Sequence, residues 1–485
     1  PAAQAHAATV LAVETALARA SLGAADKRDP YRTFHAVDAR GLQALTPAFD
    51  WTAYREALGV SARLDAYNVT EPAFFRAFDR LLHRLSLDQI KTYLRWQLAS
   101  SMSPYLAAPL VQAHFEFFGR TLIGVPQQKS RWKRCVELVD EQLGEALGQE
   151  FVARNFTPAL KASTLAMTRE VEAAMARSIQ RLTWLSDATK ARAMAKLEAI
   201  GNKIGYPDRW RDYSALAVSR DDFFANVAAG TRFEVRRQLA KIGQPPDRAE
   251  WAMTPQTVNA YYDAQMNDIN FPAGVLQPPM YDARLDDAPN YGNTGGTIGH
   301  ELIHGFDDEG RKFDAKGNLS NWWTAEDARE FERRAACVGD QYKTYTIVDR
   351  IKINPKLTMG ENLADFGGMV LAWAAWKAHV ADKVLAPIGG KRAMDFGTST
   401  AYSNGQGPML AVTQPYNKNN ATCGNGTMVA LQMPSKEKVH EVYDAAIKAG
   451  AADEGPAGPR GDTFYAGYFR DLDGNKLCAF YAPGM

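Results

Sequence analysis

Apolar residues recur three and four positions apart along most of the chain before Trp251, with polar or charged residues between them. This period places the apolar side chains on one face of a helix. Thr164–Ala199 carries the same period but is interrupted at Trp184–Asp187, where Ser186 is suited to cap the second helix. The other clear runs are Ala8–Ala20, Ala73–Arg84, Leu87–Ala99 and Val136–Phe151. The pattern predicts a helical scaffold.

The pattern changes twice farther along the chain. From about Trp251, clusters of Gly, Pro and Asn punctuate the sequence, as in Phe271-Pro272-Ala273-Gly274, and indicate loops and strand edges. From about Ala386, short runs typical of strands surround one helical run, Ser435–Ala449. The strand-like runs are Pro408–Val412, Thr427–Gln432, Gly467–Arg470 and Lys476–Tyr481. We therefore expect a mainly α protein with α+β parts, divided into 1–250, 251–383 and a separate unit 384–485.

Composition and charge narrow the function classes. The 485 residues carry 56 Lys plus Arg and 55 Asp plus Glu, a net charge of +1, which argues against a dedicated nucleic-acid binder. No stretch of about 18 apolar residues predicts a membrane span. The first residues lack the basic and apolar regions of a signal peptide, and four cysteines are too few for a disulfide scaffold.

The strongest chemical signal is His300-Glu301-Leu302-Ile303-His304. On a helix, residues four apart share a face, so both imidazoles can bind one zinc ion while Glu301 reaches a water on it. A catalytic zinc needs a third protein ligand and one open position. In the thermolysin-like arrangement, a Glu on a second helix is the third ligand, and an Asp follows it four residues later. Glu361 and Asp365 have this spacing. In the other arrangement a His follows six residues after the second His, but Gly310 stands there.

The pentapeptide alone fits a solvated helix face as well as a metal site. The flanking Gly299 and Gly305, and the pair Glu361 and Asp365, favour zinc.

Longer motifs resemble the neprilysin and endothelin-converting-enzyme metallopeptidases. Thr297–Asp308, continuing to Trp322-Trp323, is similar to the zinc helix of that family, and Glu361–Asp365 to its third-ligand motif. Asn259-Ala260-Tyr261-Tyr262 resembles its substrate strand. Arg28-Asp29-Pro30-Tyr31 and Ile204-Gly205-Tyr206-Pro207 also fit. The resemblance covers roughly residues 1–380 and implies a helical zincin (thermolysin-like) metallopeptidase.

The resemblance implies a role for each matching residue. His300, His304 and Glu361 would bind one zinc ion, and Glu301 would polarise the zinc-bound water that attacks short peptides and shuttle its proton. Asp365 would orient one zinc histidine, and Asp307 would orient another. The positions that would hold the peptide backbone are Asn259 and Ala260.

The resemblance also implies a disulfide and a location. Cys135 and Cys337 match a pair that is bridged in relatives, and two buried free thiols are the alternative. A bridge favours an oxidising compartment, so we expect a periplasmic or extracellular protein.

Both ends depart from the family. We expect the peptidase part to be truncated at its N-terminus and to lack the family's C-terminal His and Arg, since the match stops after His379. Residues 384–485 resemble part of a glyoxalase/bleomycin-resistance (vicinal oxygen chelate) domain, of βαβββ type, through Val384–Gly389, Gly424–Ala430 and Tyr468–Leu477. Met428 and Cys478 stand at its usual metal positions and suit that metal poorly.

Three functions follow from these observations. The favoured one is a zinc endopeptidase with peptide substrates and no nucleic-acid partner. One alternative is a metal-binding pseudo-peptidase that is inactive without the C-terminal segment. The other is a small-molecule binder acting through the C-terminal glyoxalase-like domain.

Overall fold

The computed structural model describes residues 2–60, 64, 66–385, 391–395, 399–403, 410–413, 428–471 and 475–483. The chain divides into two compact units, Pro1–Trp373 and Ala374–Met485. None of the helices in the described ranges combines the length and apolar character that crossing a membrane requires. The division into 1–250, 251–383 and 384–485 stays a prediction.

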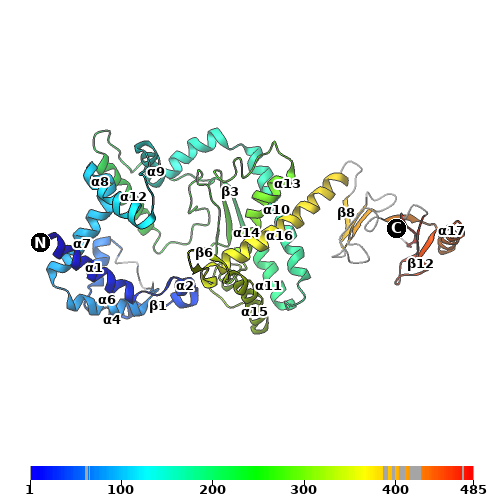
Figure 1. Ribbon diagram of the computed structural model, residues 1–485, viewed down its shortest axis with the longest axis horizontal. Helices are drawn as coiled ribbons and strands as arrows, with labels where there is room; N and C mark the ends of the chain where they lie inside the picture. Colours follow the sequence, from blue (N-terminus) through cyan, green and yellow to red (C-terminus); the bar gives the residue numbers. More distant parts are fainter. Residues whose placement is uncertain are drawn as a thin grey trace. The chain divides into compact units, whose positions relative to one another are not determined.

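Helices dominate the N-terminal part of the first unit, in agreement with the periodicity (Figure 1). Each of the helical runs named above lies within or overlaps a helix of the structure. Their bounds are α1 Ala2–Ala20, α2 Ala24–Lys27, α3 Pro30–Thr33, α4 Ala39–Leu45, α5 Trp51–Leu58, α6 Pro72–Arg84, α7 Leu87–Met102, α8 Ala108–His114, α9 Arg131–Asn155, α10 Pro158–Arg181, α11 Asp187–Glu198 and α12 Phe223–Ala240. Short pieces are the 3₁₀ turn η2 Ser103–Tyr105, the π-helix η3 Phe115–Ile123, and the paired strands β1 Ala36–Val37 and β2 Tyr67–Asn68.

The break between α10 and α11 is fixed by the cap that the sequence predicts. The Ser186 hydroxyl accepts a hydrogen bond from the backbone N–H of Thr189, 3.3 Å away, and so satisfies one unpaired donor of the first turn. Asp327, from a distant helix, accepts from the Ser186 hydroxyl at 2.5 Å. The cap therefore also joins two helices.

A small sheet lies beside the central helices. Strands β3 (Gly201–Gly205), β5 (Asp268–Pro272) and β4 (Tyr261–Asp263) follow the order β3-β5-β4, with β3 and β5 parallel and β4 antiparallel to β5. Every residue of the middle strand is buried, including the polar Asp268 and Asn270. Asp268 pairs with Lys203 and accepts a hydrogen bond from the Asn270 side chain, so both buried polar side chains have a partner. β4 lies at the edge of the sheet, and both β4 and β5 contact the helix α14 (Gly296–His304).

The remaining elements of the first unit lead to one long helix, α16, which begins in that unit and continues past Trp373 into the second. They are α13 Asp287–Asn290, the π-helix η4 Tyr291–Gly295, the 3₁₀ turn η5 Gly310–Lys312, α15 Ala325–Tyr342, β6 Thr346–Val348, β7 Ile351–Lys352 and α16 Pro355–Leu385. Helices α14 and α16 touch through glycines: a methyl group built at Gly299 would lie 2.5 Å from the Gly368 carbonyl oxygen. Only glycine at this crossing allows such a close approach of the two backbones.

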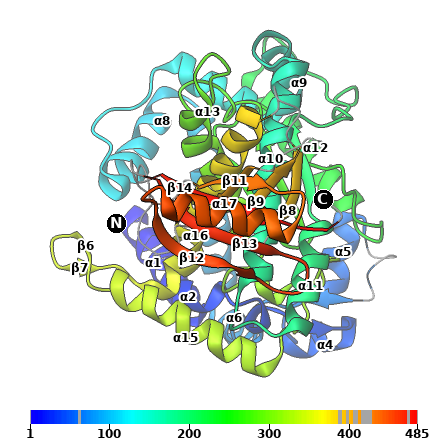
Figure 2. The same ribbon diagram turned by 90° about the vertical axis from the view of Figure 1, so that its right-hand side faces the viewer.

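The second unit has the expected βαβββ order over Met428–Tyr481. Strands β11 (Met428–Gln432), β12 (Ala452–Pro459), β13 (Tyr465–Arg470) and β14 (Lys476–Tyr481) form a sheet in the order β11-β14-β13-β12, with only the pair β11 and β14 parallel. Helix α17 (Lys436–Lys448) covers one face, where Val439 and Tyr443 pack against Phe469 and Ala479 (Figure 2). Three further strands, β8 Lys391–Asp395, β9 Ser399–Ser403 and β10 Leu410–Thr413, pair antiparallel. Parts of the glyoxalase-like motifs, at 386–389, 424–427 and 472–474, lie outside the described residues.

Candidate metal centre

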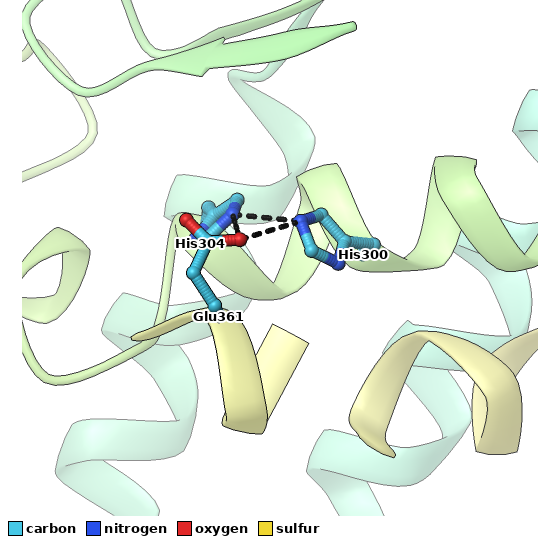
Figure 3. A group of neighbouring side chains, drawn as sticks. All are labelled: His300, His304 and Glu361. Atoms are coloured by element: carbon cyan, nitrogen blue, oxygen red, sulfur yellow. Dashed lines mark hydrogen bonds and ion pairs between the residues drawn. The ribbon is translucent and has the colours of Figure 1, made fainter. Parts of the chain in front are cut away.

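Two helices bring three potential ligands together. His300 and His304 lie one turn apart on α14, and Glu361 lies on α16. Figure 3 shows the Glu361 carboxylate beside both imidazole rings. One oxygen of Glu361, Oε2, lies 3.4 Å from Nε2 of His300 and 3.8 Å from Nε2 of His304. Within the described part of the chain, this is the group of three or more His, Cys, Asp or Glu residues that could share an ion.

The outer nitrogen of each imidazole is held by a carboxylate. Nδ1 of His300 donates to Asp365 at 2.9 Å, and Nδ1 of His304 donates to Asp307 at 2.8 Å. The two Nε2 atoms lie 2.9 Å apart. When each neutral ring carries its proton on Nδ1, both Nε2 atoms have a free lone pair, and these face one another. A tetrahedral zinc ion holds two imidazole nitrogens about 3.3 Å apart, so the two Nε2 atoms need to move only slightly apart to bind one ion.

This donor set fits zinc. Two imidazole nitrogens and one carboxylate oxygen are the protein ligands of a common class of catalytic zinc site, with a fourth position open. The Glu361 side chain is 66% exposed, which leaves the ligand cluster accessible on that side. The structure thus brings together the residues that the sequence indicates, and their ligand role remains a prediction.

Asp307 is held more firmly than Asp365. It is buried, and its second oxygen accepts hydrogen bonds from the backbone N–H groups of Glu309 and Gly310 at 2.8 and 2.7 Å. Burial lowers the pKa of His304, but the hydrogen bond and negative charge of Asp307 outweigh it, and the net pKa is raised. The Asp365 side chain is mostly exposed.

Glu301 lies buried on the same helix. Burial raises its pKa to about 7; the neighbouring Glu361 adds to the rise, while His304 and the backbone N–H of Tyr262 oppose it. A carboxyl with a pKa near neutrality can both take up and return a proton. The burial and the raised pKa of Glu301 therefore suit an acid–base group.

Asn259 and Ala260 precede the edge strand β4. Asn259 is exposed, and its side-chain oxygen accepts from the backbone N–H of Ala260 at 2.9 Å, whereas Ala260 is buried. Since β4 packs beside α14, both residues lie just before the strand that contacts the helix carrying His300 and His304. Their predicted role, to hold a substrate backbone, stays a prediction.

The expected Cys135–Cys337 disulfide is absent, so that prediction is wrong for this structure. Both thiols are free and exposed. Cys135 lies in α9 and Cys337 in α15, and Figures 1 and 2 both show these helices well apart within the first unit. A bridge requires Cα atoms within about 7 Å, which separated helices do not provide.

Sequence reasoning missed Lys196, which lies behind the site. Its side chain is 1% exposed, and its ammonium donates to the backbone carbonyls of Gly305, Gly310 and Phe313 at 2.6, 2.7 and 2.7 Å. These three bonds fix the loop that follows α14 and carries Asp307. The sequence offered one indication of its role: Lys196 shares the apolar face of α11 with Ala193 and Leu197, which are also buried.

Comparisons with known proteins point in the same direction. Two family models with the description "Peptidase family M13" match residues 1–207 and 259–399, together well over half the chain. The second match includes all the candidate ligands, Glu301, Asn259 and Ala260.

Relatives extend the comparison. Endothelin-converting enzyme 1 of Rattus norvegicus is 32% identical over 398 residues, 78% of this chain and 52% of that protein. The zinc metalloprotease ZMP1 of Mycobacterium tuberculosis, solved in complex with an inhibitor, is 38% identical with a TM-score of 0.75, covering 81% of this chain and 59% of that one. PEPO of Lactobacillus rhamnosis is 29% identical with a TM-score of 0.68, over 76% and 59%. The chain spans about half the length of the curated relatives it matches.

Proposed function

Because the chain belongs to peptidase family M13, we propose that it is a zinc-dependent endopeptidase that cleaves short peptides. One observation carries the proposal: His300, His304 and Glu361 converge from two helices, with the outer nitrogen of each imidazole bonded to a carboxylate. A solvated helix face, the alternative for the pentapeptide, does not require this second layer of partners.

The chemistry divides between the ion and the chain. When bound, zinc supplies a Lewis acid that polarises a carbonyl group and lowers the pKa of water. Glu301, within the buried wall of the site, takes the proton of the attacking water on its carboxylate and returns it to the leaving amine. Asp307 and Asp365 keep the imidazole rings oriented through their Nδ1 atoms.

The edge strand β4 supports binding of an extended peptide. An edge strand has unpaired backbone groups that an added strand can satisfy. Asn259 and Ala260, directly before β4, would hold the peptide backbone there. A periplasmic or extracellular location, expected from the resemblance, remains part of this proposal.

We keep two alternatives as proposals of lower rank. A metal-binding pseudo-peptidase shares the ligands but lacks turnover. The second alternative is a small-molecule binder that acts through the C-terminal unit, whose βαβββ order supports a glyoxalase-like fold. Burial raises the pKa of Cys478 in that sheet to about 11, so its thiol is protonated at neutral pH and is a poor metal ligand. This argues against a working chelate site at Cys478.

The test is turnover of an internally quenched fluorogenic peptide by the zinc-reconstituted chain and by Glu301→Gln. We expect turnover by the unaltered chain, abolished by a chelator and restored by zinc, and a loss of at least about 10²-fold in Glu301→Gln. Zinc bound without turnover would favour the pseudo-peptidase. Equal turnover by Glu301→Gln would contradict the mechanism.

A further inference from the structure

A segment near the N-terminus contacts both halves of the candidate metal centre. Arg28 lies between α2 and α3, far in sequence from α14 and α16. Its Nη1 donates to the backbone carbonyl of Lys356, in the first turn of α16, at 2.7 Å. Its Nε lies 3.0 Å from Oε1 of Glu309, in the loop that follows α14. One guanidinium therefore joins the loop that follows α14 to the first turn of α16, and these two helices carry the candidate ligands.

The charge around Arg28 explains why a cation is needed there. Three consecutive carboxylates, Asp307, Asp308 and Glu309, follow the metal helix. Burial, with their mutual repulsion, raises the pKa of Asp308 and raises that of Glu309 to about 7, while Arg28 opposes both shifts. Oδ1 of Asp308 is buried without a hydrogen-bond partner among the described residues, and it lies 3.6 Å from Nη2 of Arg28.

Gly360 places this contact next to a ligand. A methyl group built at Gly360 would lie 2.7 Å from Oδ2 of Asp307 and 3.0 Å from Nη2 of Arg28. Gly360 directly precedes Glu361, and Oδ2 of Asp307 is the atom that accepts from His304. The Arg28 side chain, the carboxylate behind one histidine and the backbone beside Glu361 thus meet at one point.

A second contact keeps the segment in place. Nζ of Lys312 lies 2.9 Å from Oδ1 of Asp29, and the same ammonium lies over the Tyr31 ring, 5.9 Å from its centre. Asp29 also caps α3 by accepting from the backbone N–H of Tyr31 at 3.0 Å. Arg28 is therefore anchored by its neighbours, unlike an isolated surface ion pair of little energetic consequence.

We propose that Arg28 is a positioning residue of the metal centre: by linking the loop after α14 to the first turn of α16, it fixes the position of Glu361 relative to His300 and His304. The proposal rests on the proposed zinc site. A planar guanidinium can donate in two directions at once, whereas an ammonium acts as a point charge. The site therefore requires the two donor directions of the guanidinium group as well as its positive charge.

The experiment compares Arg28→Gln and Arg28→Lys with the unaltered full chain. The first readout is the zinc dissociation constant from competition with a chromogenic chelator, and the second is the rise in thermal midpoint on adding zinc. We expect Arg28→Gln to weaken zinc binding about 10-fold, as for partners behind a ligand, and to reduce the zinc-induced rise. Arg28→Lys should recover only part of the affinity.

Arg32→Gln is the matched control. Arg32 lies on the same segment, is 59% exposed and pairs with Asp26, with a longer contact of 3.9 Å to Asp29. We expect it to leave zinc affinity unchanged. A purely structural role for Arg28 would lower the zinc-free midpoint but leave the dissociation constant of the folded fraction unchanged, and that result would overturn the proposal.

Two further outcomes are decisive. If Arg28→Gln does not fold, Arg28→Lys decides: affinity equal to that of the unaltered chain overturns the proposal, and a severalfold loss supports it. An unaltered chain that binds no zinc after reconstitution overturns the proposed function together with this inference. Normal zinc binding by both the unaltered chain and Arg28→Gln overturns this inference alone.

Discussion

The two carboxylates behind the histidines differ in what holds them. Asp307 is buried and accepts two backbone hydrogen bonds besides the one from His304. Asp365 is mostly exposed, and His300 donates to it at 2.9 Å. Each removes one degree of freedom from an imidazole, which is how such partners raise metal affinity.

Replacing Asp365 should therefore weaken the metal centre without unfolding the chain. We expect Asp365→Ala to lower zinc affinity about 10–100-fold, because His300 loses the acceptor of its Nδ1 proton. Competition with a chelator measures the change. Asp340→Ala, which removes an exposed carboxylate paired with Lys343, should have no effect. Equal affinities for Asp365→Ala and the unaltered chain would show that Asp365 is only a solvated carboxylate.

The sequence predicts residues of this site when their signal is local. The i, i+4 histidines and the pair Glu361 and Asp365 follow from helical spacing, and the structure brings them together. Lys196 and Arg28 act through backbone carbonyls of residues more than a hundred positions away. No periodicity encodes such contacts, so only the folded chain shows them.

Helices α14 and α16 depend on glycines where they cross. A methyl group built at Gly368 would lie 2.5 Å from the backbone nitrogen of His300 and 2.7 Å from the carbonyl oxygen of Gly296. The helices carry the two halves of the ligand set, so their separation sets the ligand distances. Small residues at this crossing are therefore a requirement of the site and not only of the fold.

Gly368→Ala should both destabilise the chain and weaken zinc binding. Forcing the helices apart typically costs about 1–3 kcal/mol, more than the gain of about 1 kcal/mol from replacing a helical glycine. Denaturant unfolding and chelator competition measure the two effects. Gly292→Ala, where an added methyl group meets nothing within 4 Å, is the control. If Gly368→Ala changes neither the stability nor the zinc affinity, the two helices tolerate a wider separation at their crossing.

The hydrogen bonds by which Asp327 joins α15 to the start of α11 depend on pH. Burial disfavours the charged form of Asp327, but hydrogen bonds from Ser186, Thr189 and Thr324 outweigh it and hold the pKa at about 2, against 3.8 ordinarily. Such a carboxylate stabilises the folded state above its ordinary pKa, and this contribution is lost as pH falls from about 3.8 to about 2.

We expect Asp327→Asn to lower the free energy of unfolding at pH 7 by about 2 kcal/mol, the equivalent of the pKa difference. The deficit relative to the unaltered chain should shrink as pH falls through 3 toward 2, where Asp327 itself becomes neutral. Urea unfolding at several pH values measures it. A deficit that does not change with pH would assign the effect to packing alone.

Strand β12 shows where element prediction fails. Its sequence, with Gly455, Pro456, Gly458 and Pro459, is typical of a loop, and none of the strand-like runs read from the sequence includes it. It is nevertheless a strand because it lies at the edge of the sheet, where proline need not donate to a ladder, and its pairing contains bulges. The helices of the first unit were predictable because apolar spacing alone specifies them.

The chain consists of a unit that carries the candidate ligands and a unit with its own core. The candidate ligands all lie in Pro1–Trp373, whereas α17 and its sheet form a separate apolar cluster within Ala374–Met485. The sequence predicts this division, because helical apolar spacing gives way to short strand-like runs from about Ala386. It does not predict which loops and distant side chains support the metal helix.

Zinc should therefore protect the two units differently. We expect hydrogen exchange of α14 and of the first turns of α16 to slow when zinc is added, because binding stabilises the conformation that holds the ligands. Exchange of β11–β14 should not change. The same degree of zinc protection in that sheet would show that the units fold as one.

The central claim is that His300, His304 and Glu361 hold one metal ion. Elemental analysis of the full chain after zinc reconstitution and removal of free metal tests it most directly, with His304→Ala prepared in parallel. The account predicts one zinc per chain for the unaltered protein and none for His304→Ala, since two ligands do not retain a tetrahedral ion. Absence of zinc from the unaltered chain, or equal zinc in both, would contradict it.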